Sequence, residues 1–480
     1  MSILVVDVGT SQVRSAVVRP DGRIDCLHQS AVATHHPSPG IAEFDPAALA
    51  RAALEVARAA LAQAGAVDAC GIAAQRASTV LWERASGTPV GPGIGWQDLR
   101  TAGQCLALGA RGIRLAPNQS ATKLAYLLDT FDPRRERDLC FGTVESFVAW
   151  TLSRGDLHVT DATNAAVTGL VTGDAQGWDG EVLDALGVPA AMLPRIVDSS
   201  GVLGRAGALA GAPPIAGLAG DQQASLLGQG GLHPGEAKAT FGTGAMLDCV
   251  VGVSRPPFAT RGPSGTFPIV ARRVAGVTTW GLEAIALAAG SCVAWLRDGL
   301  GLIGTLEESD ALAGSVPDSG GVSFVPALSG MGTPIWDFGA RGTLVGLSGS
   351  TTRAEVVHAV LAGIAQRGAD LLEAVEADSG ETIATLRTDG GMSANHTFAQ
   401  LLADATSRPV ALAAVLEATT LGAAFLAGVA SRTWSSLGEA VSVVAPRAVL
   451  EPRRRLDRER WLDARERALR TVPGLSALRF

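Results

Sequence analysis

Residues 3–18 read ILVVDVGTSQVRSAVV. The apolar run at 3–6 is typical of a buried strand, and a second apolar run follows at 15–18. The polar turn at 9–11 between them contains glycine, which is typical of the tip of a β-hairpin. The sequence therefore predicts two strands joined by a tight Gly-Thr-Ser turn.

This turn carries groups that can bind phosphate. Thr10 and Ser11 supply hydroxyl groups, Arg14 supplies a guanidinium, and the turn itself supplies backbone N–H groups. Asp7, at the end of the first strand, can hold Mg²⁺ directly or through water, because this ion prefers oxygen ligands. A strand followed by a Gly-Thr turn also occurs without any ligand, so an ordinary structural turn is the alternative interpretation.

The same order of strand, Gly-Thr turn and strand recurs in the middle of the chain. Residues 238–240 lead into FGTG at 241–244, and an apolar run follows at 245–251. Two such turns could grip one nucleotide across a cleft. We place the domain boundary near residue 230, in the glycine-rich stretch 228–231, where glycine gives hinge freedom. The expected domains are residues 1–230 and 231–480.

Alternating helix and strand patterns indicate an α/β chain. Asp45-Pro46 predicts the start of a helix over 47–64, with aspartate as the N-cap. A capping box at 352–355 predicts a second helix that reaches about residue 377. A strand at 385–388 leads into the loop Asp389-Gly390-Gly391, where the backbone could approach a flat nucleoside. A plain strand-to-helix turn is the alternative interpretation of this loop.

Composition excludes several classes of protein. The chain has 480 residues, 47% hydrophobic and 18% charged, which excludes disorder as its main state. Its net charge of −7 offers no positive field to nucleic acid or to anionic membranes. Its 6 cysteines are scattered without a CxxC pair, as is typical of reduced thiols in the cytoplasm, and no apolar run is long enough to span a membrane. We expect a cytoplasmic protein with a small-molecule partner, and a homodimer is one expectation for its oligomeric state.

Short motifs along the chain resemble a known family, the FGGY carbohydrate kinases, and within it the glycerol kinases most of all. The matches run in family order over about residues 3–430. They include QRASTVLWE at 75–83, IGWQDLRT at 94–101, HVTDATNA at 158–165, FGTG at 241–244, PALSGMGTPIWD at 326–337 and LGAAFLAG at 421–428.

The resemblance implies an actin-like, ribonuclease H-like fold, in which two α/β domains flank a nucleotide cleft that holds ATP. It implies that Asp7 is the carboxylate associated with Mg²⁺ and that Asp221 is the catalytic base. The pocket for the phosphoryl acceptor, the polyol or sugar whose hydroxyl is phosphorylated, would be lined by Arg76, Trp96, Asp221 and Gln222. We call it the acceptor pocket. The nucleotide would be bound by Thr10, Ser11, Arg14, Gly242, Thr243, Gly290, Gly391 and Asn395.

The chain departs from the glycerol kinase pattern at several positions. Ala77 stands where those kinases have glutamate, and Asn118 and Met246 stand where they have aromatic residues. Ala294 and Ala362 replace a glutamine and an acidic residue of the pattern. These changes leave the acceptor open: glycerol is the best single expectation, and a longer polyol or a ketopentose, as in xylulokinases, is the alternative.

The residues indicate the reaction class, phosphoryl transfer, more directly than they identify the acceptor. Phosphoryl transfer needs positioning and charge neutralisation, together with one carboxylate near the acceptor hydroxyl, and Asp7 and Asp221 can supply the acidic groups. Neither a Walker sequence nor a GxGxxG fingerprint is present. A non-catalytic, actin-like nucleotide switch remains a distant alternative, because loss of either aspartate would have favoured it and both are present.

Overall fold

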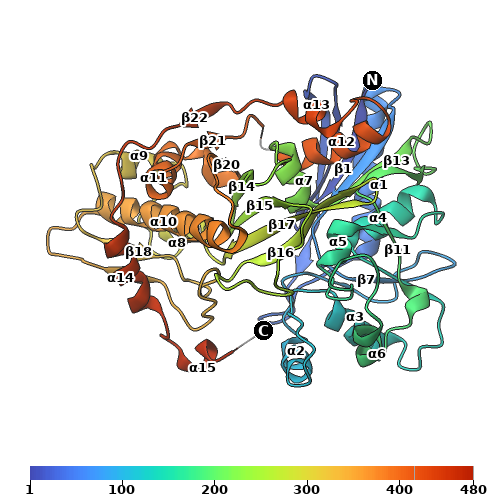
Figure 1. Cartoon of the computed structure of the whole chain (residues 1–480), viewed down its shortest axis with the longest axis horizontal. Coiled ribbons are helices and arrows are strands. Elements are labelled where there is room, and N and C mark those ends of the chain that lie inside the picture. Colours follow the sequence, from blue (N-terminus) through green and yellow to red (C-terminus); the bar gives the residue numbers. More distant parts are fainter. Residues whose placement is uncertain (416, 479–480) are drawn as a thin grey trace.

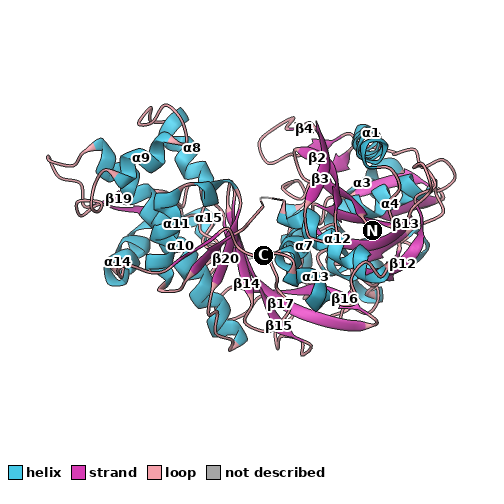
Figure 2. Ribbon diagram, turned by 90° about the horizontal axis from the view of Figure 1, so that it is seen from above, coloured by secondary structure: helices cyan, strands magenta, loops and turns pink. Residues whose placement is uncertain are grey.

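A mixed sheet runs through both lobes of the molecule (Figures 1 and 2). The computed structural model describes residues 1–415 and 417–478. In that part of the chain the sheet has 13 strands in the order β22-β21-β20-β14-β15-β17-β16-β12-β13-β6-β1-β2-β3. Figure 2 shows the helices of the two lobes gathered on either side, with α1, α3 and α4 in one lobe and α8 to α11 in the other. The lobes share a continuous sheet.

The N-terminal half of the sheet is built around the predicted hairpin. β1 (Ile3–Val8) pairs antiparallel with β2 (Gln12–Val18), which pairs with β3 (Ile24–Ala31). On the other side of β1, β6 (Ala69–Ala74) and then β13 (Pro214–Gly220) add as parallel strands. All six residues of β1 are buried, Asp7 included, which explains the apolar run at residues 3–6.

The C-terminal half repeats this arrangement. β14 (Ala237–Phe241) pairs antiparallel with β15 (Ala245–Gly252), which pairs with β17 (Val277–Ala286). β20 (Leu386–Asp389) and then β21 (Val410–Leu412) add in parallel beyond β14. The order β21-β20-β14-β15-β17 therefore matches β13-β6-β1-β2-β3 strand for strand. The doubled unit expected from residues 3–18 and 238–251 is confirmed.

The predicted helix starts are also present. In α1 (Pro46–Ala64) the Asp45 side chain accepts hydrogen bonds from the backbone N–H groups of Ala47 and Ala48. In α10 (Arg353–Ser379) Thr352 and Glu355 form the full capping box. The other helices are α2 (Ala102–Gly109), α3 (Ala121–Phe131), α4 (Val144–Ser153), α5 (Ala162–Ala166), α6 (Gly180–Leu186), α7 (Asp221–Gly228), α8 (Gly290–Asp298), α9 (Glu308–Gly314), α11 (His396–Thr406), α12 (Ala418–Ala430), α13 (Leu437–Ser442), α14 (Arg458–Ala468) and α15 (Pro473–Ser476).

The remaining strands complete the sheet or form small ribbons. β12, β16 and β22 belong to the large sheet. β12 and β16 join its two halves through one pair of residues, Ser200 and Val274. The bounds of all the remaining strands, in chain order, are β4 (Thr34–His35), β5 (Glu43–Phe44), β7 (Val80–Glu83), β8 (Gly93–Ile94), β9 (Leu139–Gly142), β10 (Val159–Asp161), β11 (Arg195–Val197), β12 (Ser200–Arg205), β16 (Phe267–Val274), β18 (Ser323–Val325), β19 (Thr343–Val345) and β22 (Ala448–Leu450).

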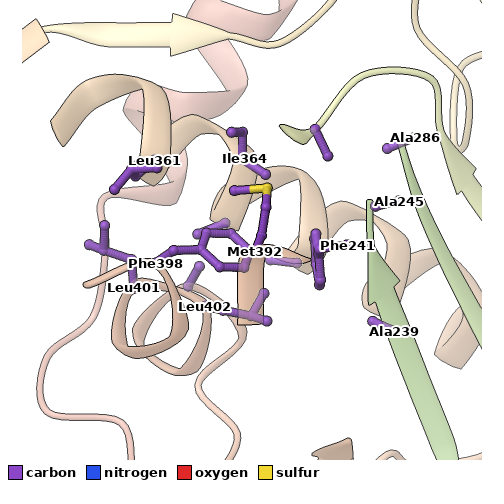
Figure 3. Close-up of a cluster of buried hydrophobic side chains, with 14 of the residues drawn as sticks. Ala239, Phe241, Ala245, Ala286, Leu361, Ile364, Met392, Phe398, Leu401 and Leu402 are labelled. Atoms are coloured by element: carbon purple, nitrogen blue, oxygen red, sulfur yellow. The ribbon is translucent and has the colours of Figure 1, made fainter. Parts of the chain in front are cut away.

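Each lobe has its own hydrophobic core, and the core of the C-terminal lobe lies between the sheet and the helices α10 and α11. There the rings of Phe241 and Phe398 pack edge to face at 4.9 Å, and Met392 and Leu402 complete the contact (Figure 3). Because Phe241 is the last residue of β14, this packing fixes the start of the turn that follows it. Within the described residues, no helix combines the length and the apolar character that a membrane crossing requires.

Helix α7 crosses α12 at very short range. Figure 1 shows α12 beside β1 although it comes late in the chain. A Cβ atom on Gly228 would lie 1.9 Å from the Ala418 carbonyl oxygen, and one on Gly422 would lie 1.8 Å from that of Ala224. Gly228 is therefore needed for close helix packing, whereas Gly230, with φ +88°, takes a left-handed conformation. The domain boundary near residue 230 stays a prediction.

We predict that Gly422→Ala destabilises the protein, because a methyl group has no room at this crossing. Overpacking of this kind costs about 1–3 kcal/mol. The matched control is Gly103→Ala in α2, where nothing lies within 4 Å of the added Cβ and where alanine favours the helix. Thermal unfolding should give a lower Tm for the first variant only. Equal Tm values for the two variants would contradict the predicted clash.

Candidate active site

The site is built at the ends of three neighbouring parallel strands. The last residues of β1, β6 and β13 are lateral partners in the sheet. Asp7 lies at the end of β1, Arg76 lies two residues after β6, and Asp221 directly follows β13 as the first residue of α7. The carboxyl ends of parallel strands meet at one edge of a sheet, where ligands bind in open α/β structures. Residues more than 200 positions apart therefore meet there.

Asp7, the acidic residue beside the first turn, is buried, with 8% of its surface exposed. Burial raises the pKa of its carboxyl to about 7, the negative charge of Asp221 raises it too, and Arg14 opposes both. Arg14 is the register partner of Asp7 across the hairpin. The turn is closed by a hydrogen bond of 2.9 Å from the Gly9 N–H to the Gln12 carbonyl oxygen. Asp7, the predicted Mg²⁺ carboxylate, and Arg14, a predicted phosphate ligand, thus lie side by side.

Trp96 connects the first turn with the predicted acceptor pocket. Its indole N–H donates to Thr10 Oγ1 at 3.1 Å. Behind it, the buried Lys123 Nζ donates to the carbonyl oxygens of Trp96 and Asn118, at 3.2 Å and 3.3 Å. Burial lowers the pKa of the Lys123 amine to about 7. Trp96 is therefore held at both its ring and its backbone.

Arg76 lies between the two lobes. Its Nη2 is 2.5 Å from Glu283 Oε2 on β17, and its Nε is 3.6 Å from Asp221 Oδ1. The same Nη2 contacts the sulfur of Met246 at 3.9 Å. A Cβ atom on Gly220 would lie 2.8 Å from the Arg76 side chain, so glycine at that position leaves room for the arginine side chain.

Asp221 and Gln222 open helix α7, where both are half-buried. Asp221 Oδ1 accepts a hydrogen bond of 2.8 Å from the Gln222 N–H. Burial raises the pKa of Asp221, although the charges of Arg76 and Lys238 lower it. Gln222 Oε1 accepts a very short hydrogen bond from the Lys238 ammonium. Three of the four residues predicted to line the substrate pocket thus form a chain of contacts, in which Asp221 touches both Arg76 and Gln222. The fourth, Trp96, is hydrogen-bonded to Thr10.

The second turn follows β14 and contacts the two predicted nucleoside segments. Its Gly242 N–H donates to the Gly244 carbonyl oxygen at 2.9 Å, and Thr243 is exposed. Gly290, the first residue of α8, donates to the Gly242 carbonyl oxygen at 2.8 Å, and a Cβ on Gly290 would lie 2.6 Å from that oxygen. A Cβ on Gly390, whose φ is +86°, would similarly lie 2.5 Å from the Phe241 carbonyl oxygen. The structure therefore brings Gly242, Thr243 and Gly290 together.

Asn395 has a structural role in addition to its predicted one. It is the N-cap of α11, where its Oδ1 accepts from the Phe398 N–H at 2.8 Å and its Nδ2 donates to Ser309 at 3.0 Å. Gly391 is exposed, and nothing lies within 4 Å of a Cβ placed on it. Contact of these two residues with a nucleoside stays a prediction, as does contact of the exposed Ser11 with phosphate.

The positions that depart from the glycerol kinase pattern fall in different surroundings. Ala77 is buried, with φ +60°, directly after Arg76. Asn118 is exposed, and Met246 touches Arg76 as described. Ala294 on α8 and Ala362 on α10 are half-buried. Met246 is thus the departure with a direct contact to a predicted pocket residue.

Sequence reasoning missed Lys123, Lys238, Asp248 and Glu283 as parts of the site. Lys238, Asp248 and Glu283 are each the only charged residue of their strand, and all three are buried. Charged side chains are rarely buried without a partner. That pattern was the available signal, but it does not reveal which strands pair.

The acidic residues fit a magnesium ion shared with phosphate. Asp7 lies close enough to Asp221 for the charge of Asp221 to raise its pKa. Among residues 1–415 and 417–478, no group of three or more His, Cys, Asp or Glu side chains could hold a metal by itself. Mg²⁺ typically binds through one or two carboxylates and completes its shell with water and substrate phosphates. Asp7, with the Asp221 carboxyl near it, would fit the part of the one or two protein carboxylates in such a site.

Two family models match the chain. The N-terminal domain of the FGGY family of carbohydrate kinases matches residues 2–228, and the C-terminal domain of the same family matches residues 237–431. The chain belongs to the FGGY family of carbohydrate kinases.

Individual FGGY relatives match over nearly the whole chain. A glycerol kinase of Aromatoleum aromaticum is 42% identical, with 97% of this chain and 98% of the relative covered. A glycerol kinase of Thermus brockianus is 40% identical, with 94% of each chain covered. The crystal structure of Plasmodium falciparum glycerol kinase with ADP superposes with a TM-score of 0.90 at 26% identity, over 98% of each chain.

A xylulose kinase structure from Lactobacillus acidophilus has a TM-score of 0.84 at 22% identity, over 97% of this chain and 96% of that one, which shows a shared fold. The predicted FGGY membership, the two α/β domains and the kinase class are confirmed. The chain is a carbohydrate kinase, and a non-catalytic switch is therefore set aside.

We predict that Asp7→Asn stabilises the protein at pH 8 more than at pH 5. The pKa of Asp7 is raised by folding, so its carboxylate form opposes folding. This cost is nearly absent below pH 4, grows as the pH rises towards 7, and is complete above pH 7. The difference in unfolding free energy between pH 5 and pH 8 should be on the order of 2 kcal/mol.

The measurement is the Tm of variant and wild type at both pH values. The buried Glu145, whose pKa burial raises to about 7, is present in both proteins, so its contribution cancels in the comparison. Asp184→Asn, at an exposed position of α6, is the control and should leave the Tm unchanged at either pH. An equal increase in the Tm of Asp7→Asn over wild type at pH 5 and pH 8 would contradict the predicted titration of Asp7.

Proposed function

We propose that this kinase transfers the γ-phosphoryl group of ATP to a hydroxyl of a small polyol, with glycerol as the first candidate. The observation that supports this most is the shared edge of β1, β6 and β13, where Asp7, Arg76 and Asp221 lie together. Relatives with about 40% identity over nearly the full length are named glycerol kinases. The product would be glycerol 3-phosphate.

Asp221 would act as the general base. It would take the proton from the acceptor hydroxyl while the acceptor oxygen bonds to the γ-phosphorus and the bond from that phosphorus to ADP breaks. Its raised pKa suits this task, since a base works best when its pKa approaches the working pH. Arg76 and Gln222 would hold the other hydroxyls, and Trp96 would cover the carbon edge.

The two turns would hold the phosphates. Thr10, Ser11 and Arg14 would contact them from the N-terminal lobe, and Gly242 and Thr243 from the C-terminal lobe. Asp7 would hold Mg²⁺, which neutralises phosphate charge when it is bound. Gly290, Gly391 and Asn395 would lie along the nucleoside.

A longer polyol or a ketopentose is the second candidate acceptor. Ala77 removes a carboxylate that could accept a hydrogen bond from a hydroxyl, and an unpaired buried polar group costs about 1–3 kcal/mol. Met246 offers Arg76 a flexible thioether in place of a rigid ring. Both changes favour a roomier pocket that is less closely matched to three carbons.

We predict that Asp221→Asn lowers kcat by about 10²- to 10⁴-fold, because the general base is lost. ATP affinity should change little, since Asp221 lies on the acceptor side. The measurements are steady-state turnover and calorimetric titration with ATP. Asp184→Asn is the control. A folded Asp221→Asn protein with nearly normal turnover would remove Asp221 from the mechanism.

We predict that Ala77→Glu shifts selectivity towards glycerol, because it restores a carboxylate beside Arg76. The test compares kcat/KM for glycerol, tetritols, pentitols, ketopentoses and hexoses in an ATP-consumption assay. The wild type should bind glycerol weakly or prefer a longer acceptor. A low micromolar KM for glycerol with no turnover of longer polyols would refute the roomier pocket and leave the kinase reaction intact.

A further inference from the structure

Three charged side chains form a row across the sheet of the C-terminal lobe. Lys238 on β14 is the register partner of Asp248 on β15, and Asp248 is the register partner of Glu283 on β17. Directly opposed residues on neighbouring strands point to the same face. All three are buried, with 0%, 0% and 6% of their surface exposed. We call Lys238, Asp248 and Glu283 the charged row.

Both ends of the charged row touch predicted acceptor residues of the other lobe. Glu283 forms the ion pair of 2.5 Å with Arg76, and the Lys238 ammonium donates to Gln222 Oε1. Asp248, in the middle, is 2.8 Å from the Lys238 Nζ. Each end therefore holds one acceptor residue, and Asp248 holds the lysine.

Arg76 has two competing carboxylates. Glu283 lies at 2.5 Å from its Nη2, and Asp221 lies at 3.6 Å from its Nε. A buried arginine that loses one carboxylate partner is drawn to the other, because an unpaired buried charge is costly. Without the charge of Glu283, Arg76 would turn towards Asp221. It would then neutralise the base and leave the position from which it binds acceptor hydroxyls.

We propose that the charged row is a positioning device for the acceptor site, with Glu283 holding Arg76 and the Asp248–Lys238 pair holding Gln222. This inference rests on the proposed function. Acceptor recognition would then depend on three residues of the C-terminal lobe that do not themselves bind the acceptor. The acceptor pocket would be complete only when the two lobes are in contact through these pairs.

Glu283→Gln is the main test, because it keeps the size of the side chain and removes its charge. The KM for the acceptor should rise by about 10- to 100-fold, the effect of losing one charged hydrogen bond. The KM for ATP should not change, because Glu283 contacts none of the predicted nucleotide-binding residues in the described part of the chain. Glu283→Asp, which restores the charge on a shorter side chain, should recover part of the loss. The acceptors are glycerol, xylitol and D-xylulose.

Glu145→Gln is the matched control. Glu145 is also a fully buried glutamate, and it is hydrogen-bonded by Thr143 and Thr160 at 2.6 Å each. Any general loss of stability caused by neutralising a buried carboxyl should appear in Glu145→Gln as well. The KM of Glu145→Gln for the acceptor should equal that of the wild type. Asp248→Asn provides a second approach to the row, should Glu283→Gln fail to fold, and is expected to raise the acceptor KM in the same selective way.

Three outcomes separate the possibilities. An unchanged acceptor KM in folded Glu283→Gln and Asp248→Asn proteins overturns the inference alone. Equal increases in the KM values for acceptor and ATP also overturn it, because they indicate general loosening of the site. A wild type that consumes ATP with none of the three acceptors overturns the proposed function instead.

Discussion

The crossing of α7 and α12 is the constraint on which the site depends. Asp221 and Gln222 are the first two residues of α7, so the position of this helix sets the position of the proposed base. Gly228 and Gly422 allow the two helix backbones to touch, and no side chain would fit between them. The far end of α7 is held to the C-terminal lobe, where Ser225 and Gln229 donate to Asp389 at 2.8 Å and 2.9 Å. One short helix thus connects both lobes with the acceptor side of the site.

The site gathers three acidic side chains, Asp7, Asp221 and Glu283, in buried surroundings. Burial raises the pKa values of Asp7, Asp221 and Glu283, so each of these carboxylates opposes folding when it is ionised. Arg76 and Lys238 offset part of this cost through short contacts. Such an arrangement is typical of functional sites, where charge is kept for chemistry at the expense of stability.

The sequence predicted the fold well because its strongest signals are local. The hairpin of residues 3–18, its repeat at 238–251 and the caps of α1 and α10 each depend on residues close together in the chain. Within the site, the turn after β1 indicated a phosphate and Mg²⁺ site by itself, whereas Arg76 and Asp221 were named through the resemblance to the FGGY kinases. The charged row could not be predicted, because its members lie on strands up to 45 positions apart and only their register brings them together. The capping role of Asn395 and the close packing of Gly228 likewise depend on neighbours from distant segments.

Lys123 and Lys238 are the only two lysines in the chain, and both are fully buried within the site. One holds the backbone of Trp96, and the other joins Gln222 to Asp248. Every basic side chain at the surface is therefore an arginine or a histidine. Acylating reagents, and enzymes that acetylate or ubiquitinate lysine, find no side-chain amine on the folded protein. Labelling of Lys238 would consequently require that its contacts with Gln222 and Asp248 first open.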